Sequence, residues 1–336
     1  MTRSACLIFN PVAGQGNPEV DLERIKTLLE PTIALDIHMT TEEIDADHLA
    51  REAVKRGVEA IIASGGDGTL SATAAALVGT NIPFGVISRG TANAFANALG
   101  IPDTIDAACQ VILQGKTQVV DAAYCNGKPM ILLAGIGFEA EAVEQASRES
   151  KNRFGMLAYI LAGVRQLQNL QTFEAEIETE DKIISVTATA VTIANAAPNT
   201  SILAQGPAGV VFDDGVLDVT IVAPANVAGA IAASYNLLRT AFSGLASQRD
   251  DIGYLRAKSI KVKTEPPQKV VLDGEIIGTT PIEIECVPGG LTVFVPTAEE
   301  EEEALLEKLE GLPNLVIEDK VMKAKPEIEA EVLMAG

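Results

Sequence analysis

A strand, a glycine-rich loop and a helix are predicted for residues 59–78, which read EAIIASGGDGTLSATAAALV. The stretch Glu59–Ser64 has the length and apolar content of a buried strand, and Leu70–Val78 is Ala-rich and helical. Between them, the glycines allow positive φ angles and a close approach of backbone N–H groups to a ligand. A helix N-terminus also favours an anion. The segment therefore predicts a phosphate site, with a plain tight turn as the alternative.

The loop itself reads Gly65-Gly66-Asp67-Gly68-Thr69 and lacks the Gly-Lys-Ser/Thr of a Walker A loop. Its aspartate would repel phosphate oxygens unless a cation lay between them. Carboxylates and phosphates are the ligands that Mg²⁺ prefers. Asp67 therefore predicts a Mg²⁺ ion at this site, bound directly or through water.

The same alternation of strands, loops and helices extends on both sides of this segment. Strands are predicted for Ala5–Asn10, Ile33–Met39 and Phe84–Ser88, and helices for Val20–Leu29, Leu49–Arg56 and Ala92–Leu99. This repetition predicts a parallel sheet with helices on both faces, as in Rossmann-like α/β domains. Two further loops, at residues 10–16 and 88–93, also follow strands. Because ligands bind at the carboxyl ends of parallel strands, the three loops could enclose one nucleotide.

After residue 119 strand patterns predominate, and turn residues separate them. Strands are predicted for Met130–Gly135, Thr172–Thr179, Lys182–Ala194, Leu217–Val222, Ser259–Thr264, Val270–Leu272, Ile282–Cys286 and Leu291–Val295, with helices near Phe154–Leu170 and Val227–Ser243. An antiparallel β-sandwich is the expected architecture. We expect a nucleotide domain at 1–121, a β-rich domain at 122–296 and an acidic tail at 297–336. The tail has twelve acidic residues against four lysines, and Leu305, Leu306 and Leu309 predict one short helix in it.

The bulk composition excludes several classes of protein. A net charge of -21 argues against nucleic-acid binding and requires any membrane contact to be local. No signal peptide and no membrane span are predicted, so a soluble, cytoplasmic and at most peripheral protein is expected. The four cysteines lack metal-site spacing, which indicates neither a zinc site nor a redox pair. His38, in a strand, and His48, at a helix start, are not expected to be catalytic.

Further motifs follow in the second half. Asp273-Gly274-Glu275 lies between two predicted strands, and Asp213-Asp214-Gly215 precedes another. Each alone is most simply a hairpin turn. Together with Asn10-Pro11 and Gly90-Thr91-Ala92-Asn93, however, the sequence resembles the bacterial lipid kinases related to diacylglycerol kinase and sphingosine kinase. The motifs occur in that family's order over residues 3–296.

The resemblance implies a Rossmann-like nucleotide domain followed by a β-sandwich, with ATP and a lipid alcohol in the cleft between them. It implies Glu275 as the general base on the lipid hydroxyl. It implies a structural Mg²⁺ at Asp214 with the backbone carbonyls of Val211 and Val216. The residues implied around ATP are Asn10, Thr40, Gly65, Gly66, Asp67, Gly68, Thr69, Leu70, Ser71, Ala72, Thr91 and Asn93. We expect a lipid such as diacylglycerol as the second substrate. We also expect transient peripheral contact with the membrane and assembly into a homodimer.

This sequence departs from the family pattern at two places. Ser71-Ala72 and Asn93-Ala94 stand where the family often has Asn-Glu and Asn-Asp, so two acidic residues are missing, and Arg89 could compensate the charge. Two alternatives to an active lipid kinase stay open. One is an NAD kinase-like enzyme, because NAD kinases share the central loop. The other is an inactive nucleotide- or lipid-binding regulator.

Overall fold

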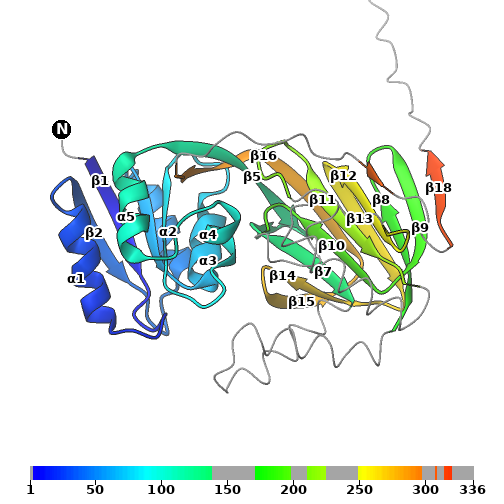
Figure 1. Ribbon diagram of the computed structural model, residues 1–336, viewed down its shortest axis with the longest axis horizontal. Helices are drawn as coiled ribbons and strands as arrows, with labels where there is room; N and C mark the ends of the chain where they lie inside the picture. The colour runs from blue at the N-terminus through cyan, green and yellow to red at the C-terminus, as the bar shows by residue number, and fades with distance from the viewer. Residues whose placement is uncertain are drawn as a thin grey trace, which may run out of the picture.

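A computed structural model describes residues 3–137, 171–197, 210–224, 249–296, 307–308 and 314–319. Figure 1 shows an N-terminal α/β domain, coloured blue to cyan, beside a C-terminal domain of strands. The helices predicted at Phe154–Leu170 and Val227–Ser243 lie outside the described residues, as does most of the acidic tail. In the part of the chain that is described, no helix is long and apolar enough to span a membrane.

The N-terminal domain is built on four parallel strands in the order β2-β1-β3-β4. Their bounds are β1 Arg3–Phe9, β2 Ile33–Met39, β3 Ile61–Gly65 and β4 Phe84–Ser88. β3 and β4 are buried along their whole length, as expected for central strands covered on both faces. The predicted parallel sheet is confirmed.

Helices cover both faces of this sheet. They are α1 Pro18–Leu29, α2 Ala46–Arg56, α3 Asp67–Leu77, α4 Ala94–Ala98 and α5 Ile105–Gln114. Alternate residues of β1 face the two sides: Leu7 packs with α1 and α5, and Cys6 packs with α2 and α3. α5 was not predicted, although Thr104 caps its N-terminus and Gly115, at φ 71°, ends it.

The C-terminal domain packs two sheets around one apolar core, which confirms the sandwich. Its strands are β5 Thr117–Cys125, β6 Lys128–Met130, β7 Leu133–Gly137, β8 Phe173–Glu178, β9 Lys182–Ala188, β10 Ala190–Ala194, β11 Leu217–Val222, β12 Ile252–Ala257, β13 Ser259–Glu265, β14 Lys269–Leu272, β15 Glu275–Thr279 and β16 Ile282–Phe294. Among the described residues, one sheet has the order β15-β14-β7-β10-β11-β12, followed at its edge by β17 (Glu307–Lys308).

The other sheet runs through both domains. β16 pairs with β5 and β13 in the sandwich and, at Val293, with Phe84 of β4, so the N-terminal sheet continues into the C-terminal one. Figure 1 shows β5 and β16 extending from one domain to the other. The expected break near Asp121 therefore falls inside β5, on a strand that belongs to both domains.

Three strand predictions in this half were wrong in detail. Residues 182–194 form two strands in different sheets, because the chain turns at Thr189, whose N–H and hydroxyl both donate to the Val222 carbonyl. Conversely, residues 282–294 form one strand with an irregularity between Val287 and Leu291. β5, β6, β12 and β15 were missed.

Two short strands from the tail cover sheet edges. β17 (Glu307–Lys308) pairs with β12, and β18 (Val316–Asp319) pairs with β9. A short helix was predicted from Leu305, Leu306 and Leu309. It is wrong at Glu307 and Lys308, which lie between these leucines and pair as a strand.

Candidate active site

The three predicted loops meet at the carboxyl ends of β1, β3 and β4, and backbone hydrogen bonds join them. Asn10 N donates to the Ser64 carbonyl at 2.9 Å, and Arg89 N donates to the Gly65 carbonyl at 2.7 Å. The Asn10 side chain also reaches the next loop, since its Nδ2 donates to Thr69 Oγ1 at 2.8 Å. The three loops therefore form one connected surface, as their positions in the sequence predicted.

The glycines of the central loop serve close packing. A Cβ atom on Gly90 would lie 2.9 Å from Gly66 Cα, and one on Gly65 would lie 2.6 Å from the Thr69 side chain. Glycine allows positive φ angles, but Gly65, Gly66 and Gly68 do not adopt them. Glycine is needed here for space rather than for a left-handed backbone.

The N-terminus of α3 is open toward the loops. Its N-cap residue is Gly66, and no side chain caps the first turn. The N–H groups of a first helical turn have no partner within the helix, and together with the helix dipole they favour an anion. The N-terminus of α3 is thus free to receive an anion, and the phosphate site at this loop stays a prediction.

Asp67 begins α3, and its carboxylate accepts two backbone N–H groups from the neighbouring loop. Oδ2 accepts from Asn93 N at 2.9 Å, and Oδ1 accepts from Ala94 N at 2.5 Å. Asn93 itself has a left-handed backbone, with φ 49°. Asp67 therefore holds the start of α4 against the glycine loop, a role that the sequence did not suggest.

Arg89 lies beneath the loops, not at their surface. Its Nε donates to Asp21 Oδ2 at 2.9 Å, its Nη1 donates to the Asn10 carbonyl at 2.8 Å, and its guanidinium lies 4.4 Å from the Phe9 ring centroid. Only 3% of the side chain is exposed. Arg89 therefore anchors the Asn10 loop and is not positioned as the free compensating charge that we considered.

The remaining residues predicted to contact ATP differ in how far they are exposed. Thr40 follows β2, and its N–H donates to the Phe9 carbonyl at 3.0 Å. Thr91 is exposed, whereas Leu70 is fully buried in the core. Ser71 and Ala72 are half-buried in the first turns of α3. Leu70 can thus contribute to a nucleotide site through its backbone alone.

The Asp273-Gly274 turn joins β14 to β15 as a hairpin, with φ angles of 47° and 91°. The Asp273 carboxylate also accepts the N–H groups of Ile131, Leu132 and Leu133 at 2.8, 2.9 and 2.9 Å. Burial raises the pKa of Asp273, and these three donors oppose the rise. The turn is therefore more than an ordinary hairpin.

The segment held by Asp273 faces the N-terminal domain. Ile131 and Leu132 are buried in the same apolar cluster as Leu70 and Phe95, which belong to α3 and α4. β14 and β15 lie at the end of the C-terminal domain nearest to these helices (Figure 1). Glu275, the first residue of β15, is exposed at that end.

Asp121 was missed as a candidate residue, although an aspartate inside the apolar strand VVDAAY is unusual enough to be a signal. It is 4% exposed. Its carboxylate accepts from Gly215 N at 2.6 Å and from Gly289 N at 2.8 Å. Asp121 therefore joins β5, the Asp214-Gly215 turn and the irregular part of β16 at the junction of the two domains.

Asp214 lies in a charged network. One oxygen accepts from Val216 N at 3.2 Å, and the other lies 3.2 Å from Arg256 Nη1. Arg256 Nε also donates to Asp218 at 2.8 Å, and the Tyr254 hydroxyl donates to Asp218 as well. Burial raises the pKa of Asp218 to about 6.

Comparisons with known proteins agree with this architecture. The family pattern for a diacylglycerol kinase catalytic domain matches residues 4–125, and that for a YegS C-terminal NAD kinase beta sandwich-like domain matches residues 133–295. The diacylglycerol kinase of Bacillus subtilis strain 168 is 32% identical over 306 residues, which cover 89% of this chain and 99% of that protein. The chain belongs to the bacterial lipid kinase family related to diacylglycerol kinase.

Further similar proteins give the same picture. Uncharacterized protein sll0036 of Synechocystis is 51% identical over 306 residues, covering 88% of this chain and 71% of that protein. A crystal structure of a diacylglycerol kinase from Bacillus anthracis has a TM-score of 0.69 and 26% identity, covering 88% of this chain and 97% of that one. As a member of this lipid kinase family, the chain is an ATP-dependent phosphotransferase.

Proposed function

We propose that this lipid kinase transfers the γ-phosphate of ATP to the free hydroxyl of a lipid alcohol such as diacylglycerol, with Glu275 as the general base. One observation carries the proposal. Asp273 holds residues 131–133, which pack against α3 and α4, and Glu275 follows two residues later on the same turn. Glu275 is exposed at the first position of β15, next to the turn that holds the segment packed against α3 and α4.

The uncapped N-terminus of α3 supports ATP binding by the N-terminal domain. We place the phosphates against the backbone of Gly65–Ala72, where first-turn N–H groups are available. Asn10, Thr40, Thr91 and Asn93 come from the loops beside it and would complete the nucleotide site. In this arrangement Asn10 acts partly by orienting Thr69, to which it donates.

Asp67 fits a Mg²⁺ ion at the phosphates. Each of its carboxylate oxygens accepts one backbone N–H and keeps a further lone pair. When bound, Mg²⁺ would neutralise the charge that develops on the transferred phosphoryl group. Asp67 would hold it, while the N–H groups of α3 position the phosphates.

The second Mg²⁺ site, at Asp214 with the carbonyls of Val211 and Val216, remains part of the proposal. The Asp214 carboxylate is 27% exposed and makes only 3.2 Å contacts with Val216 N and Arg256, so it keeps lone pairs for a cation. Burial raises the pKa of Asp214, and Arg256 opposes that rise. A cation there would stabilise the junction between the two domains.

Glu275 suits the role of base because phosphoryl transfer requires mainly positioning and charge neutralisation. A carboxylate that accepts the hydroxyl proton during transfer contributes about 10²- to 10⁴-fold to the rate. A base carried by the domain opposite the nucleotide would complete the site only when both substrates are bound. This arrangement would limit transfer of phosphate to water.

The test is turnover of γ-labelled ATP with a total lipid extract and, separately, with NAD. We expect a labelled lipid with wild type, and turnover lower by about 10²- to 10⁴-fold in Glu275→Gln with nearly unchanged ATP binding. Glu285→Gln, an exposed carboxylate on β16, is the matched control and should keep full activity. Labelled NADP instead of lipid would favour the NAD kinase alternative.

ATP binding without a labelled product on any acceptor would favour the inactive regulator instead, which Ala72 and Ala94 motivate. Full activity of Glu275→Gln would exclude that residue as the base. A cytoplasmic location, transient membrane contact and a homodimer complete the proposal. Flotation with vesicles that contain diacylglycerol tests the membrane contact, and light scattering of the purified chain tests the dimer.

A further inference from the structure

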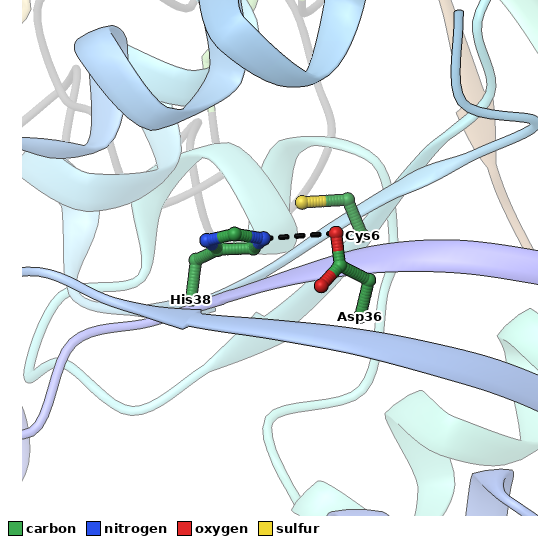
Figure 2. A group of neighbouring side chains, drawn as sticks. All are labelled: Cys6, Asp36 and His38. Atoms are coloured by element: carbon green, nitrogen blue, oxygen red, sulfur yellow. Dashed lines mark hydrogen bonds and ion pairs between the residues drawn. The ribbon is translucent and has the colours of Figure 1, made fainter. Parts of the chain in front are cut away.

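A second cluster of reactive side chains lies away from the phosphate loops, on strands β1 and β2. Cys6 of β1 is the register partner of Asp36 of β2, and His38 lies on the same face of β2, two residues further on. Figure 2 shows the three side chains pointing toward one another. Their donor atoms, Sγ, a carboxylate oxygen and an imidazole nitrogen, all lie within 4.8 Å of one another.

A positive charge already occupies the point where these donors converge. Arg56, the last residue of α2, places its Nη2 2.9 Å from Asp36 Oδ2, 3.3 Å from His38 Nε2 and 3.7 Å from Cys6 Sγ. Zinc–ligand distances are shorter, about 2.3 Å for sulfur and about 2.0–2.2 Å for nitrogen and oxygen. A contraction of about 0.7–1.4 Å around that point would bring all three donors to a metal ion.

The arginine does not satisfy the cluster, because His38 Nε2 has two incompatible contacts. It lies 2.8 Å from Asp36 Oδ2, where a bond requires a proton on Nε2, and 3.3 Å from Arg56 Nη2, where a bond requires a lone pair. One ring nitrogen carries either a proton or a lone pair. A metal ion removes the conflict, since it takes a lone pair from each of the three donors at once.

We propose that Cys6, Asp36 and His38 bind a thiophilic divalent cation such as Zn²⁺, in exchange for Arg56. A sulfur, nitrogen and oxygen donor set is one that zinc accepts. Arg56 can leave because its side chain is 44% exposed at the end of a helix. Asp36 and His38, at 59% and 30% exposure, give the ion a path from solvent. Three protein ligands leave one coordination position for water.

The cluster differs from the proposed Mg²⁺ sites in its ligands and position. The ligand atoms proposed at Asp67 and Asp214 are oxygens, which favour Mg²⁺, whereas a thiolate favours zinc-like ions. The strands β1 and β2 continue into Asn10 and Thr40, so the cluster lies behind the nucleotide site and not in it. Metal binding here can therefore be measured without reference to kinase activity.

The experiment titrates the reduced full-length chain with Co²⁺ and follows the thiolate-to-cobalt absorption band, with Zn²⁺ as competitor. Mildly alkaline pH is needed, because burial raises the pKa of Cys6 to about 11 and the ion must displace the thiol proton. We expect one ion per chain with a sulfur band. Arg56→Gln should bind about tenfold more tightly, because it removes a competing positive charge.

Variants distinguish metal binding at this cluster from metal binding elsewhere on the chain. Cys6→Ser should lose the sulfur band and Asp36→Asn should weaken it, whereas Cys109→Ser, which changes a buried cysteine in a different core, should keep it. Because Cys6 is buried, thermal unfolding must show that Cys6→Ser is folded, and the exposed Asp36→Asn provides an independent test. A band that survives in Cys6→Ser, or none in either wild type or Arg56→Gln, would overturn the proposal.

Discussion

The phosphate loop and the Asp273 turn use the same device in different settings. In each, an aspartate among glycines accepts backbone N–H groups from another segment: Asp67 holds residues 93 and 94, and Asp273 holds residues 131–133. Asp67 joins two loops of one domain, whereas Asp273 fixes a segment that packs between domains. Both aspartates therefore shape the site. Asp67 is in addition the proposed Mg²⁺ ligand, whereas Asp273 leaves the proposed chemistry to Glu275.

The largest effect is expected from Asp273→Ala. It leaves three N–H groups in a buried region without their acceptor, at a cost of about 1–3 kcal/mol for each donor that water cannot reach. We expect the free energy of unfolding to fall by about 3 kcal/mol and turnover to fall with it. Urea unfolding measures the change in the free energy of unfolding. Asp273→Asn keeps one acceptor oxygen, so its free energy of unfolding should fall clearly less. Equal falls in the two variants would contradict the role of Asp273 as the acceptor of these N–H groups.

Asp67→Ala should have a smaller effect on stability, because it removes two N–H acceptors at a loop surface. Loss of such a cap costs about 1 kcal/mol. Activity should fall far more than stability does, since the same carboxylate is the proposed Mg²⁺ ligand. Turnover at saturating Mg²⁺ and the midpoint of unfolding are measured for the variant and for wild type, and the two changes are compared. A variant with full turnover would remove Asp67 from the metal proposal.

A paired glycine substitution tests whether the phosphate loop depends on space. Gly90→Ala would place a Cβ 2.9 Å from Gly66 Cα and 2.8 Å from Asn93 Oδ1, so the two loops must separate. Gly16→Ala is the matched control, because its Cβ would lie 3.5 Å from Asp21, an ordinary contact, and Gly16 is not among the residues proposed to contact ATP. We expect ATP affinity to fall about tenfold in the first, which corresponds to about 1.4 kcal/mol. Equal affinities by calorimetry would show that close packing is not what the loop requires.

The smallest effect concerns pH. Because burial raises the pKa of Asp273 above its ordinary value of 3.8, the folded chain binds that proton more tightly than the unfolded chain. Its contribution to stability therefore falls as the pH rises through the range above 3.8. Asp273→Asn cannot titrate. The stability of wild type relative to this variant should decrease as the pH is raised, as measured by urea unfolding at several pH values.

The sequence predicted the N-terminal domain well, because its strands are short apolar runs and its loops carry glycine. The β-rich half was harder. Residues 182–194 are one apolar run, yet Thr189 turns the chain from one sheet to the other, and that turn depends on the Val222 carbonyl far along the chain. α5 was overlooked although Thr104 and Gly115 mark its ends.

The site was predictable where its residues are neighbours in the sequence, and not where distant segments meet. The motif Asp273-Gly274-Glu275 was visible, but its hold on residues 131–133 depends on the pairing of β14 with β7. Likewise, the spacing of cysteines indicated no zinc site. Cys6 and Asp36 become neighbours only through the parallel register of β1 and β2, which no local pattern reveals.

The tail strands β17 and β18 have a practical consequence. Each extends one sheet at an edge strand, β12 or β9, whose backbone groups would otherwise be open to pairing. Unpaired edges are templates on which other chains assemble. Removal of the residues after 296 would keep the whole matched family region and yet expose both edges. Such a truncated chain should be more prone to self-association, so crystallisation and assays are better carried out on the chain with its tail retained.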